Sequence, residues 1–331
     1  MRCLSLPKPA SIETRPLQPR VRDLPSPARG QLRLHVRACG VCHTDLHTVE
    51  GEITPPGYPI VPGHQIIGTV DAVGEGVADW ALGDRAGVAW LHAACGTCDF
   101  CRRGEENLCP RARFTGFHVD GGYAEAVLAE AAFTFAIPPG ISDEQAAPLL
   151  CAGIIGYRSL RQADLSPGET VGLVGFGASA HLALPIARHW GCSVYVFSRG
   201  ERHRQLALDL GAAWAGTIDQ PPPTLLDRAV LFAPVGSLVP RTLQLLRPGG
   251  TLAINAIHMS DIPSIPYAAL YGERTLRTVA NATRRDGNEF LALAAQIGLR
   301  PTVTSYALED ANQALLDLKQ GRMQGAAVLI P

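Results

Sequence analysis

The hydrophobic and polar positions of this chain follow one pattern up to about residue 150 and another from Pro167 onwards. In the first part, residues 32–37 alternate apolar and polar side chains, which is typical of a half-buried strand. Residues 66–73 form an apolar run that closes on a Gly-Glu-Gly turn, and residues 82–88 contain another turn and strand. We therefore expect the first part to be mostly β-structure, in short and irregular pieces.

From Pro167 onwards, runs of strand length alternate with segments of helical spacing. The expected strands are residues 170–174, 193–198, 227–232 and 251–255, the last of them preceded by a Pro-Gly-Gly turn. The expected helices between them are residues 178–190, 201–210 and 238–246. Repeated β-α-β units of this kind predict a doubly wound parallel sheet, so the fold class is α/β. Two helices near residues 289–297 and 308–318 and a strand at residues 326–330 are expected to follow.

The composition adds mainly exclusions to this picture. Hydrophobic residues make up 47% and charged residues 18% of the 331 residues, which is the balance of a folded globular protein. The formal net charge of −1 gives no electrostatic reason to expect nucleic acid or an anionic membrane as a partner. The first ten residues contain no apolar signal core, and no run approaches the roughly 18 apolar residues of a membrane span, so we expect a cytoplasmic protein.

Nine cysteines in such a protein suggest metal binding or catalysis before disulfides. Four of them follow the spacing C-x2-C-x2-C-x7-C, namely Cys95, Cys98, Cys101 and Cys109. Four thiolates within one short loop can complete a tetrahedral zinc shell of the structural kind. An iron–sulfur ligand run is the alternative, although the bacterial ferredoxin spacing has three residues before its last cysteine where this chain has seven. Cys3, Cys39 and Cys192 lie outside such motifs and are expected to be plain thiols.

A second group of chemically active residues lies at residues 40–47. Cys42, Thr44 and Asp45 place a thiol, a hydroxyl and a carboxylate within four positions. A catalytic metal requires similar groups: a soft anionic ligand, a hydroxyl for proton transfer and a carboxylate that orients an imidazole. His64 and Cys151 supply further ligands elsewhere in the chain. A short motif of this kind can also be incidental, so these residues alone leave the metal role open.

The second part of the chain begins with a glycine-rich turn. Gly175, Gly177 and Ala180 form the pattern G-x-G-x-x-A directly after an expected strand and at the start of an expected helix. Glycines serve many ordinary turns, but this context is the one that the dinucleotide-binding motif requires. Gly177 would let the backbone approach a pyrophosphate, whose negative charge is stabilised at a helix N-terminus.

The end of the next expected strand bears on the choice of cofactor. NAD-dependent enzymes usually carry an acidic residue there, which binds the ribose 2′-hydroxyl, but this chain has Ser198 and Arg199. Arg199 can pair with a 2′-phosphate, so the sequence favours NADP(H) and leaves NAD(H) open. The alternative is a solvated arginine with no cofactor role.

Taken together, these motifs resemble those of zinc-dependent alcohol dehydrogenases of the medium-chain dehydrogenase/reductase superfamily, over nearly the whole chain. The resemblance implies a GroES-like, β-rich catalytic domain at residues 1–152 and 284–331, which carries the structural zinc loop. It implies a Rossmann cofactor domain at residues 153–283. It also implies a homodimer or homotetramer and a small-molecule alcohol or aldehyde as substrate.

The same resemblance assigns roles to the residues of the catalytic domain. Cys42, His64 and Cys151 would bind a catalytic zinc with one open position. The four-cysteine loop would bind a structural zinc, which makes two zinc ions per chain. Asp45 would hydrogen-bond the ring of His64.

The remaining assignments concern the proton and the cofactor. Thr44 would pass the alcohol proton to a relay that ends at His47, and His43 would face the cofactor pyrophosphate. Gln65 stands where a glutamate usually follows the zinc-binding histidine. Trp90 resembles an aromatic residue that lines the alcohol pocket and narrows it towards primary alcohols, although ordinary packing explains it nearly as well.

We therefore expect a zinc-dependent oxidoreductase that interconverts a primary alcohol and its aldehyde with NADP(H) or NAD(H). A polyol or formaldehyde dehydrogenase on the same scaffold is one alternative. A non-catalytic, NADP(H)-binding zinc protein is another, and it would predict an incomplete catalytic ligand set.

Overall fold

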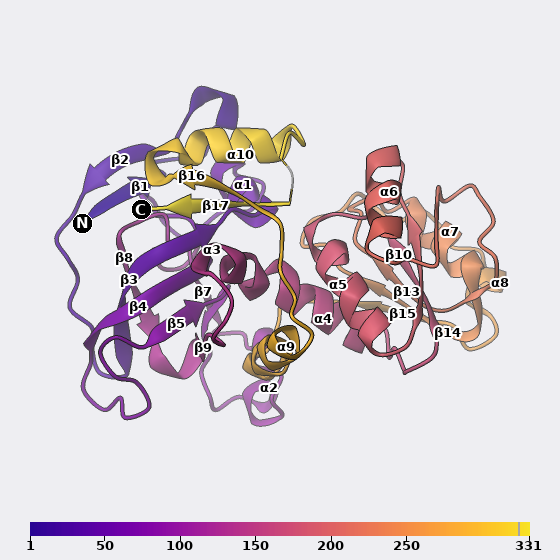
Figure 1. Ribbon diagram of the computed structural model, residues 1–331, viewed down its shortest axis with the longest axis horizontal. Helices are drawn as coiled ribbons and strands as arrows, with labels where there is room; N and C mark the ends of the chain where they lie inside the picture. Colours follow the sequence, from indigo (N-terminus) through magenta and orange to yellow (C-terminus); the bar gives the residue numbers. More distant parts are fainter. Residues whose placement is uncertain (324) are drawn as a thin grey trace. The chain divides into compact units, whose positions relative to one another are not determined.

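The computed structural model describes residues 1–323 and 325–331, which form two compact units (Figure 1). The first unit comprises Met1–Cys151 and Asn281–Pro331, and the second comprises Ala152–Ala280. Within these described residues, no helix has the length and apolar character needed to cross a membrane.

The first unit is built on a seven-stranded sheet. Its strands, in spatial order, are β16 (Val303–Ala307), β17 (Ala326–Ile330), β3 (Gln31–Gly40), β4 (Gln65–Val73), β5 (Arg85–Val88) and β9 (Thr134–Ala136), and β8 (Ala126–Glu130) also pairs with β3. All neighbours are antiparallel except β16 and β17. The pairing of β17 with β3 joins the last segment of the chain to its first part.

Smaller elements complete the first unit. Two short antiparallel pairs are β1 (Arg2–Ser5) with β2 (Gln18–Val21) and β6 (Leu91–Ala93) with β7 (Arg113–Phe114). The helices are α1 (His43–Glu50), α2 (Asp99–Arg102), α3 (Asp143–Ala146), α9 (Arg284–Gln296) and α10 (Ala311–Lys319). Short 3₁₀ turns lie at Ile12–Thr14, Glu106–Leu108, Ala131–Phe133, Ala147–Leu150 and Leu308–Asp310.

Strand β3 shows why this sheet forms. The side chains of Leu32, Leu34 and Val36 are buried and alternate with more exposed neighbours, as expected from the alternation in the sequence. The strand is longer than residues 32–37, because Ala38 to Gly40 are buried and pair with β4. It therefore delivers the chain directly to Cys42.

Both helices of the last segment begin at other residues than expected. Helix α9 starts five residues before residue 289, because Thr283 and Asp286 form a capping box. Thr283 Oγ1 accepts a bond from the Asp286 N–H (3.1 Å), and Asp286 Oδ2 accepts one from the Thr283 N–H (2.8 Å). Helix α10 starts three residues later than expected, because Leu308–Asp310 forms a 3₁₀ turn.

The second unit is a six-stranded parallel sheet, and this confirms the expected doubly wound α/β fold. Its spatial order is β12 (Trp214–Gly216), β11 (Ser193–Phe197), β10 (Thr170–Val174), β13 (Leu226–Leu231), β14 (Leu246–Ile254) and β15 (Thr275–Thr278). This is the strand order 3-2-1-4-5-6 of dinucleotide-binding folds. The helices are α4 (Ala152–Gln162), α5 (Ala178–His189), α6 (Glu201–Asp209), α7 (Leu238–Leu245) and α8 (Tyr267–Leu270), with α5 and α7 on opposite sides of the sheet (Figure 1).

The sequence patterns missed α4, α8, β12 and β15. Helix α4 contains two glycines, which are poor helix formers, but Gly156 is required by packing. A Cβ there would lie 2.7 Å from the carbonyl oxygen of Ser179, so the glycine allows α4 and α5 to pack closely. The expected Pro-Gly-Gly turn lies within β14, where Gly249 has a φ of +75° and the pairing with β13 is interrupted between Leu246 and Thr251.

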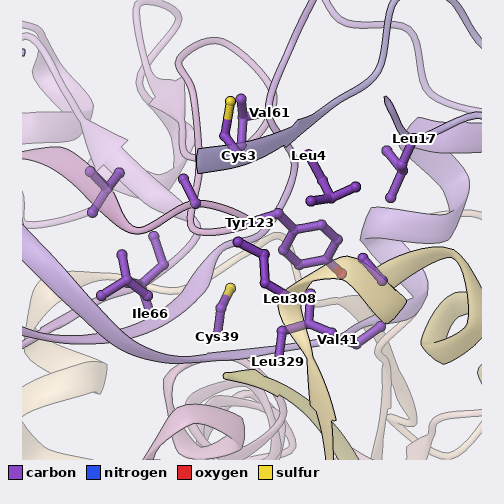
Figure 2. Close-up of a cluster of buried hydrophobic side chains, with 14 of the residues drawn as sticks. Cys3, Leu4, Leu17, Cys39, Val41, Val61, Ile66, Tyr123, Leu308 and Leu329 are labelled. Atoms are coloured by element: carbon purple, nitrogen blue, oxygen red, sulfur yellow. The ribbon is translucent and has the colours of Figure 1, made fainter. Parts of the chain in front are cut away.

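The core of the first unit contains several polar or reactive side chains. Figure 2 shows Tyr123 among its buried side chains, together with Leu4, Cys39 and Leu308. Cys3, Cys39 and Cys192 are all buried, as plain core thiols would be.

Candidate active site and metal centres

Three possible metal ligands from distant segments meet in the first unit. Cys42 follows β3 and caps α1, His64 precedes β4, and Cys151 follows the 3₁₀ turn Ala147–Leu150. Two sulfur atoms and one ring nitrogen from these residues lie within 4.8 Å of one another. The Sγ atoms of Cys42 and Cys151 are 3.9 Å apart. Two thiolates on one tetrahedral zinc, each about 2.3 Å from the ion, would be about 3.8 Å apart.

His64 is oriented for binding by Asp45. The ring Nδ1 lies 2.9 Å from Asp45 Oδ1, and the two side chains are only 1% and 2% exposed. The other ring nitrogen, Nε2, is buried and has no hydrogen-bond partner among the described residues. Because a buried polar atom normally has a partner, this nitrogen fits a metal ligand. The residues present therefore fit a zinc ion.

The charges of the three side chains are strongly coupled. The hydrogen bond with Cys151, followed by the effect of His64, holds the pKa of the Cys42 thiol well below its usual range. The same hydrogen bond, together with burial, raises the pKa of Cys151 well above its usual range. Burial favours neutral His64, but Asp45 and Cys42 outweigh it and raise its pKa to about 10. A divalent metal ion can bind to these three side chains in place of the protons that they share.

Helix α1 carries further residues of the expected site, and Thr44 lies beside the triangle. The Sγ of Cys42 is 3.8 Å from the hydroxyl oxygen of Thr44. The rings of His43 and His47 are 6.4 Å apart on the same helix. His47 Nδ1 contacts the carboxylate of Glu52, a residue that the sequence patterns did not single out. Because α1 ends at Gly51 with a left-handed conformation, Glu52 turns back towards His47.

Gln65 is buried at the start of β4. Its side chain lies against Gly40, where an added Cβ would come within 3.0 Å of three of its atoms. Gly40 is its pairing partner across the two strands. The glycine therefore makes room for the glutamine, and among the described residues no hydrogen bond of its amide is found.

Aromatic rings line one side of the site. Trp90 is half-buried and lies edge-on to His64, with ring centres 5.0 Å apart. It stacks on Phe114 at 5.2 Å and is 5.7 Å from Phe117. His118 lies against both phenylalanines and accepts a bond from the Phe114 N–H at 3.2 Å. The sequence patterns pointed to Trp90 alone, although two phenylalanines shortly after the cysteine loop were visible.

The four cysteines of the loop also converge. Their sulfur atoms lie within 4.8 Å of one another, with 3.8 Å between Cys95 and Cys101 and 3.5 Å between Cys98 and Cys101. These spacings match four thiolates on one zinc ion. The backbone N–H groups of Thr97 and Cys98 lower the pKa of Cys95 to about 5, whereas burial raises that of Cys101 to about 12.

The glycine-rich turn lies in the second unit, between β10 and α5. Gly175 has a φ of +91°, and a Cβ there would lie 2.7 Å from the backbone nitrogen of Ala233, so glycine is required. A Cβ at Gly177 would meet nothing within 4 Å, which leaves the backbone at the N-terminus of α5 open. Ala180 is fully buried in the first turn of the helix. These features fit a pyrophosphate site.

The end of β11 presents the expected residues. Ser198 is buried, and Arg199 is exposed. Arg204 donates hydrogen bonds to the carbonyl oxygens of both residues, at 2.9 and 2.8 Å. The sequence patterns missed Arg204, which shapes this turn from helix α6.

Comparison with known proteins agrees with these features. The family model for the alcohol dehydrogenase GroES-like domain matches residues 28–139. A probable alcohol dehydrogenase, AdhA, from Mycobacterium tuberculosis is 47% identical over 329 residues, which cover 98% of this chain and 95% of the relative. An alcohol dehydrogenase from Geobacillus stearothermophilus is 34% identical over 316 residues, with 93% of each chain covered.

Three solved structures share the fold over nearly their whole length. A cinnamyl alcohol dehydrogenase from Sorghum bicolor has a TM-score of 0.90 and 27% identity, with 99% of this chain and 97% of that chain covered. A Helicobacter pylori CAD in complex with NADP(H) has a TM-score of 0.88 and 25% identity, with 100% and 99% covered. An acetophenone reductase from Geotrichum candidum in complex with NAD has the same two values, with 100% and 97% covered. The chain therefore belongs to the alcohol dehydrogenases of the medium-chain dehydrogenase/reductase superfamily.

Proposed function

We propose that this alcohol dehydrogenase depends on zinc and interconverts a primary alcohol and its aldehyde, with NADP(H) preferred over NAD(H). The observation that carries the proposal is the triangle of Cys42, His64 and Cys151. Two sulfur atoms at single-ion spacing face a histidine nitrogen that has no other partner among the described residues.

A zinc ion held by these side chains would supply a Lewis acid that lowers the pKa of a bound alcohol. Side chains of the protein would remove the hydroxyl proton of the alcohol. The Thr44 hydroxyl, near Cys42, accepts it from the alcohol and passes it towards His47. Glu52 contacts Nδ1 of the His47 ring, and the imidazole of His47 would take up the proton.

The four-cysteine loop would hold a second zinc ion, with a closed ligand shell and a structural role. The sulfur spacings and the backbone N–H groups directed at Cys95 support a single ion bound by thiolates. An iron–sulfur cluster is the alternative that metal analysis excludes or establishes.

The nicotinamide cofactor would carry the hydride. Gly175, Gly177 and Ala180 support a pyrophosphate site, and the expected role of His43 towards the pyrophosphate stays a prediction. Arg199, exposed at the end of β11, supports recognition of a 2′-phosphate. Similar solved structures contain NADP(H) in one case and NAD in another, so they favour neither cofactor, and Arg199 is the feature that supports NADP(H).

The aromatic side of the site supports a narrow pocket. Trp90 lies against His64 and is held in place by Phe114 and Phe117, so its ring is rigid. A primary alcohol has a hydrogen atom where a secondary alcohol has a second carbon substituent, so it fits more easily beside such a ring. A polyol or formaldehyde dehydrogenase is the alternative within the same chemistry.

The test is metal analysis and an activity panel on one preparation, with primary and secondary alcohols, polyols, formaldehyde and both cofactors. We expect about two zinc ions per chain, no acid-labile sulfide, and the highest kcat/KM with a primary alcohol or its aldehyde. One zinc, labile sulfide, or no activity in the presence of full metal content would contradict the proposal.

The cofactor preference has a separate test. Arg199→Ala should lower kcat/KM for NADPH by roughly 10- to 150-fold, because a charge-assisted bond to phosphate is lost. The value for NADH should change far less. Arg202→Ala is the matched control, since Arg202 is also exposed at this turn. If kcat/KM of the wild type for NADH equals or exceeds that for NADPH, Arg199 is a surface charge with no role in cofactor recognition.

A further inference from the structure

Tyr123 lies behind the metal-binding histidine, in the core of the first unit. Its side chain is fully buried (Figure 2). Its ring packs against Gly63, where an added Cβ would lie 2.4 Å from the ring. Its backbone N–H donates to the Pro62 oxygen at 3.0 Å, and its carbonyl accepts from Leu4 at 2.8 Å. The residue is therefore fixed next to the segment that carries His64.

The hydroxyl of Tyr123 is directed at Asp45. It lies 3.3 Å from Asp45 Oδ2, which also accepts the Cys42 N–H at 2.9 Å. Asp45 Oδ1 accepts the Gly63 N–H at 3.2 Å and faces His64 Nδ1 at 2.9 Å. The buried carboxylate thus has two donors on each oxygen, and Tyr123 is the side-chain donor opposite His64.

Each hydrogen-bond donor stabilises part of the negative charge on a carboxylate. In a buried site this stabilisation has a large effect, since no water replaces a lost donor. A carboxylate with fewer donors pulls harder on the proton of the histidine. The histidine then gives more electron density to a metal ion. The strength of the bond between Asp45 and His64 therefore depends on the Tyr123 hydroxyl.

We propose that Tyr123 is a positioning residue for the metal centre, and that it acts through Asp45 on His64. This inference rests on the zinc site of the proposed function. Its competitor is a purely structural role, in which the ring fills the core and the hydroxyl is incidental.

The test is Tyr123→Phe, which removes one oxygen atom and keeps the ring. The chain offers a matched control in Tyr58, whose hydroxyl is also buried but has no hydrogen-bond partner among the described residues. Two quantities are measured for each variant. One is the affinity of the triangle for Co²⁺, by competition with a chelator. The other is the pH profile of kcat/KM for alcohol oxidation in the zinc enzyme.

We expect Tyr123→Phe to bind Co²⁺ about threefold more tightly and to raise the apparent pKa of alcohol oxidation by about half a unit. The reason is that Asp45 becomes the stronger acceptor while the Cys42 and Gly63 N–H groups keep it in place. Tyr58→Phe should change neither quantity. In an Asp45→Asn background, Tyr123→Phe should also have no effect on either.

A Tyr123→Phe variant that matches Tyr58→Phe would overturn the inference and leave the proposed zinc site intact. An effect of equal size with and without Asp45→Asn would show a structural role and would also overturn it. A wild type that binds no metal at the triangle would overturn both the inference and the proposed function.

Discussion

Cys95, Cys98, Cys101 and Cys109 come from one loop of 15 residues, whereas Cys42 and Cys151 are 109 residues apart in the chain. Most cysteines of both groups are half-buried, but His64 and its partner Asp45 are almost completely buried. The loop supplies its own N–H donors to sulfur, for example from Cys98 to Cys95 at 3.3 Å. A ligand group that is local in sequence can order itself around an ion. A group assembled from three segments requires a folded sheet first.

Glu106 ties the cysteine loop to the rest of its unit. Glu106, 5% exposed, accepts hydrogen bonds from the backbone and the side chain of Arg284 at the start of α9, both at 3.1 Å. Arg284 also lies over the ring of Phe133 at 4.5 Å. The catalytic triangle, in contrast, is held by the Asp45 network. The difference suggests that disturbing the loop changes stability, and disturbing the triangle changes chemistry.

The largest expected effect separates the two sites directly. Cys42→Ala should lower kcat/KM by more than about a thousandfold, because the Lewis acid is lost, and should leave one zinc per chain with nearly unchanged stability. Cys98→Ala should instead remove the other zinc and lower the melting temperature or solubility. Zinc content, activity and thermal unfolding of both variants check this. Equal losses of stability in the two variants would break the comparison.

His92, in the strand β6 that precedes the cysteine loop, should make the stability of the protein depend on pH. Burial, opposed by Glu130, lowers the pKa of His92 to about 4, below the value of about 6.5 in an unfolded chain. The unfolded state therefore binds the extra proton between pH 6.5 and 4, and the folded state should lose about 3 kcal/mol of stability as the pH falls through this window. His92→Asn should remove that part of the pH dependence. Urea unfolding at pH 7, 5.5 and 4.5 measures it, and parallel curves for the two proteins would contradict it.

The charge near the triangle should tune its chemistry. Zinc with two thiolates and one neutral imidazole is formally neutral, so a carboxylate at position 65 would make the site negative and resist formation of an alkoxide. Gln65→Glu should therefore raise the apparent pKa of alcohol oxidation by about 1 unit. The pH profile of kcat/KM at saturating cofactor, with zinc content checked, is the measurement. An unchanged or lower pKa would remove the electrostatic role of Gln65.

The smallest expected effect concerns the link between loop and helix. Glu106→Gln should lower the free energy of unfolding by about 1 kcal/mol, because half-exposed Arg284 loses a charged acceptor but keeps a neutral one. The kcat and the pH profile should stay as in the wild type. Urea unfolding and steady-state kinetics of the variant test both statements. A shift in the pH profile would mean that the loop influences the catalytic triangle.

Much of the fold followed from local patterns. The strand at residues 170–174 was predicted with the observed bounds, and α5 and α6 differ from prediction by one residue at their ends. The elements that were missed depend on distant partners. Helix α4 tolerates Gly156 because α5 packs against it, and β15 exists because β14 lies beside it.

The candidate site divides in the same way. Spacing along the chain pointed to the four cysteines and to the turn at Gly175, because the residues of each motif lie close together in the sequence. The assignment of Cys151 to the same site as Cys42 came from family resemblance. The roles of Glu52, Phe114, Tyr123 and Arg204 depend on contacts that only the tertiary structure creates.

What the sequence determined by itself is therefore local. It shows which loop can hold a metal, which turn can approach a phosphate, and which segments have the hydrophobic periodicity of a strand or of a helix. The tertiary structure decided which of these groups meet, and which buried hydrogen bonds surround them. The physical reason is one of range. Backbone conformation and the spacing of side chains act over a turn or two, whereas the position of Tyr123 behind Asp45 depends on packing between residues 78 positions apart.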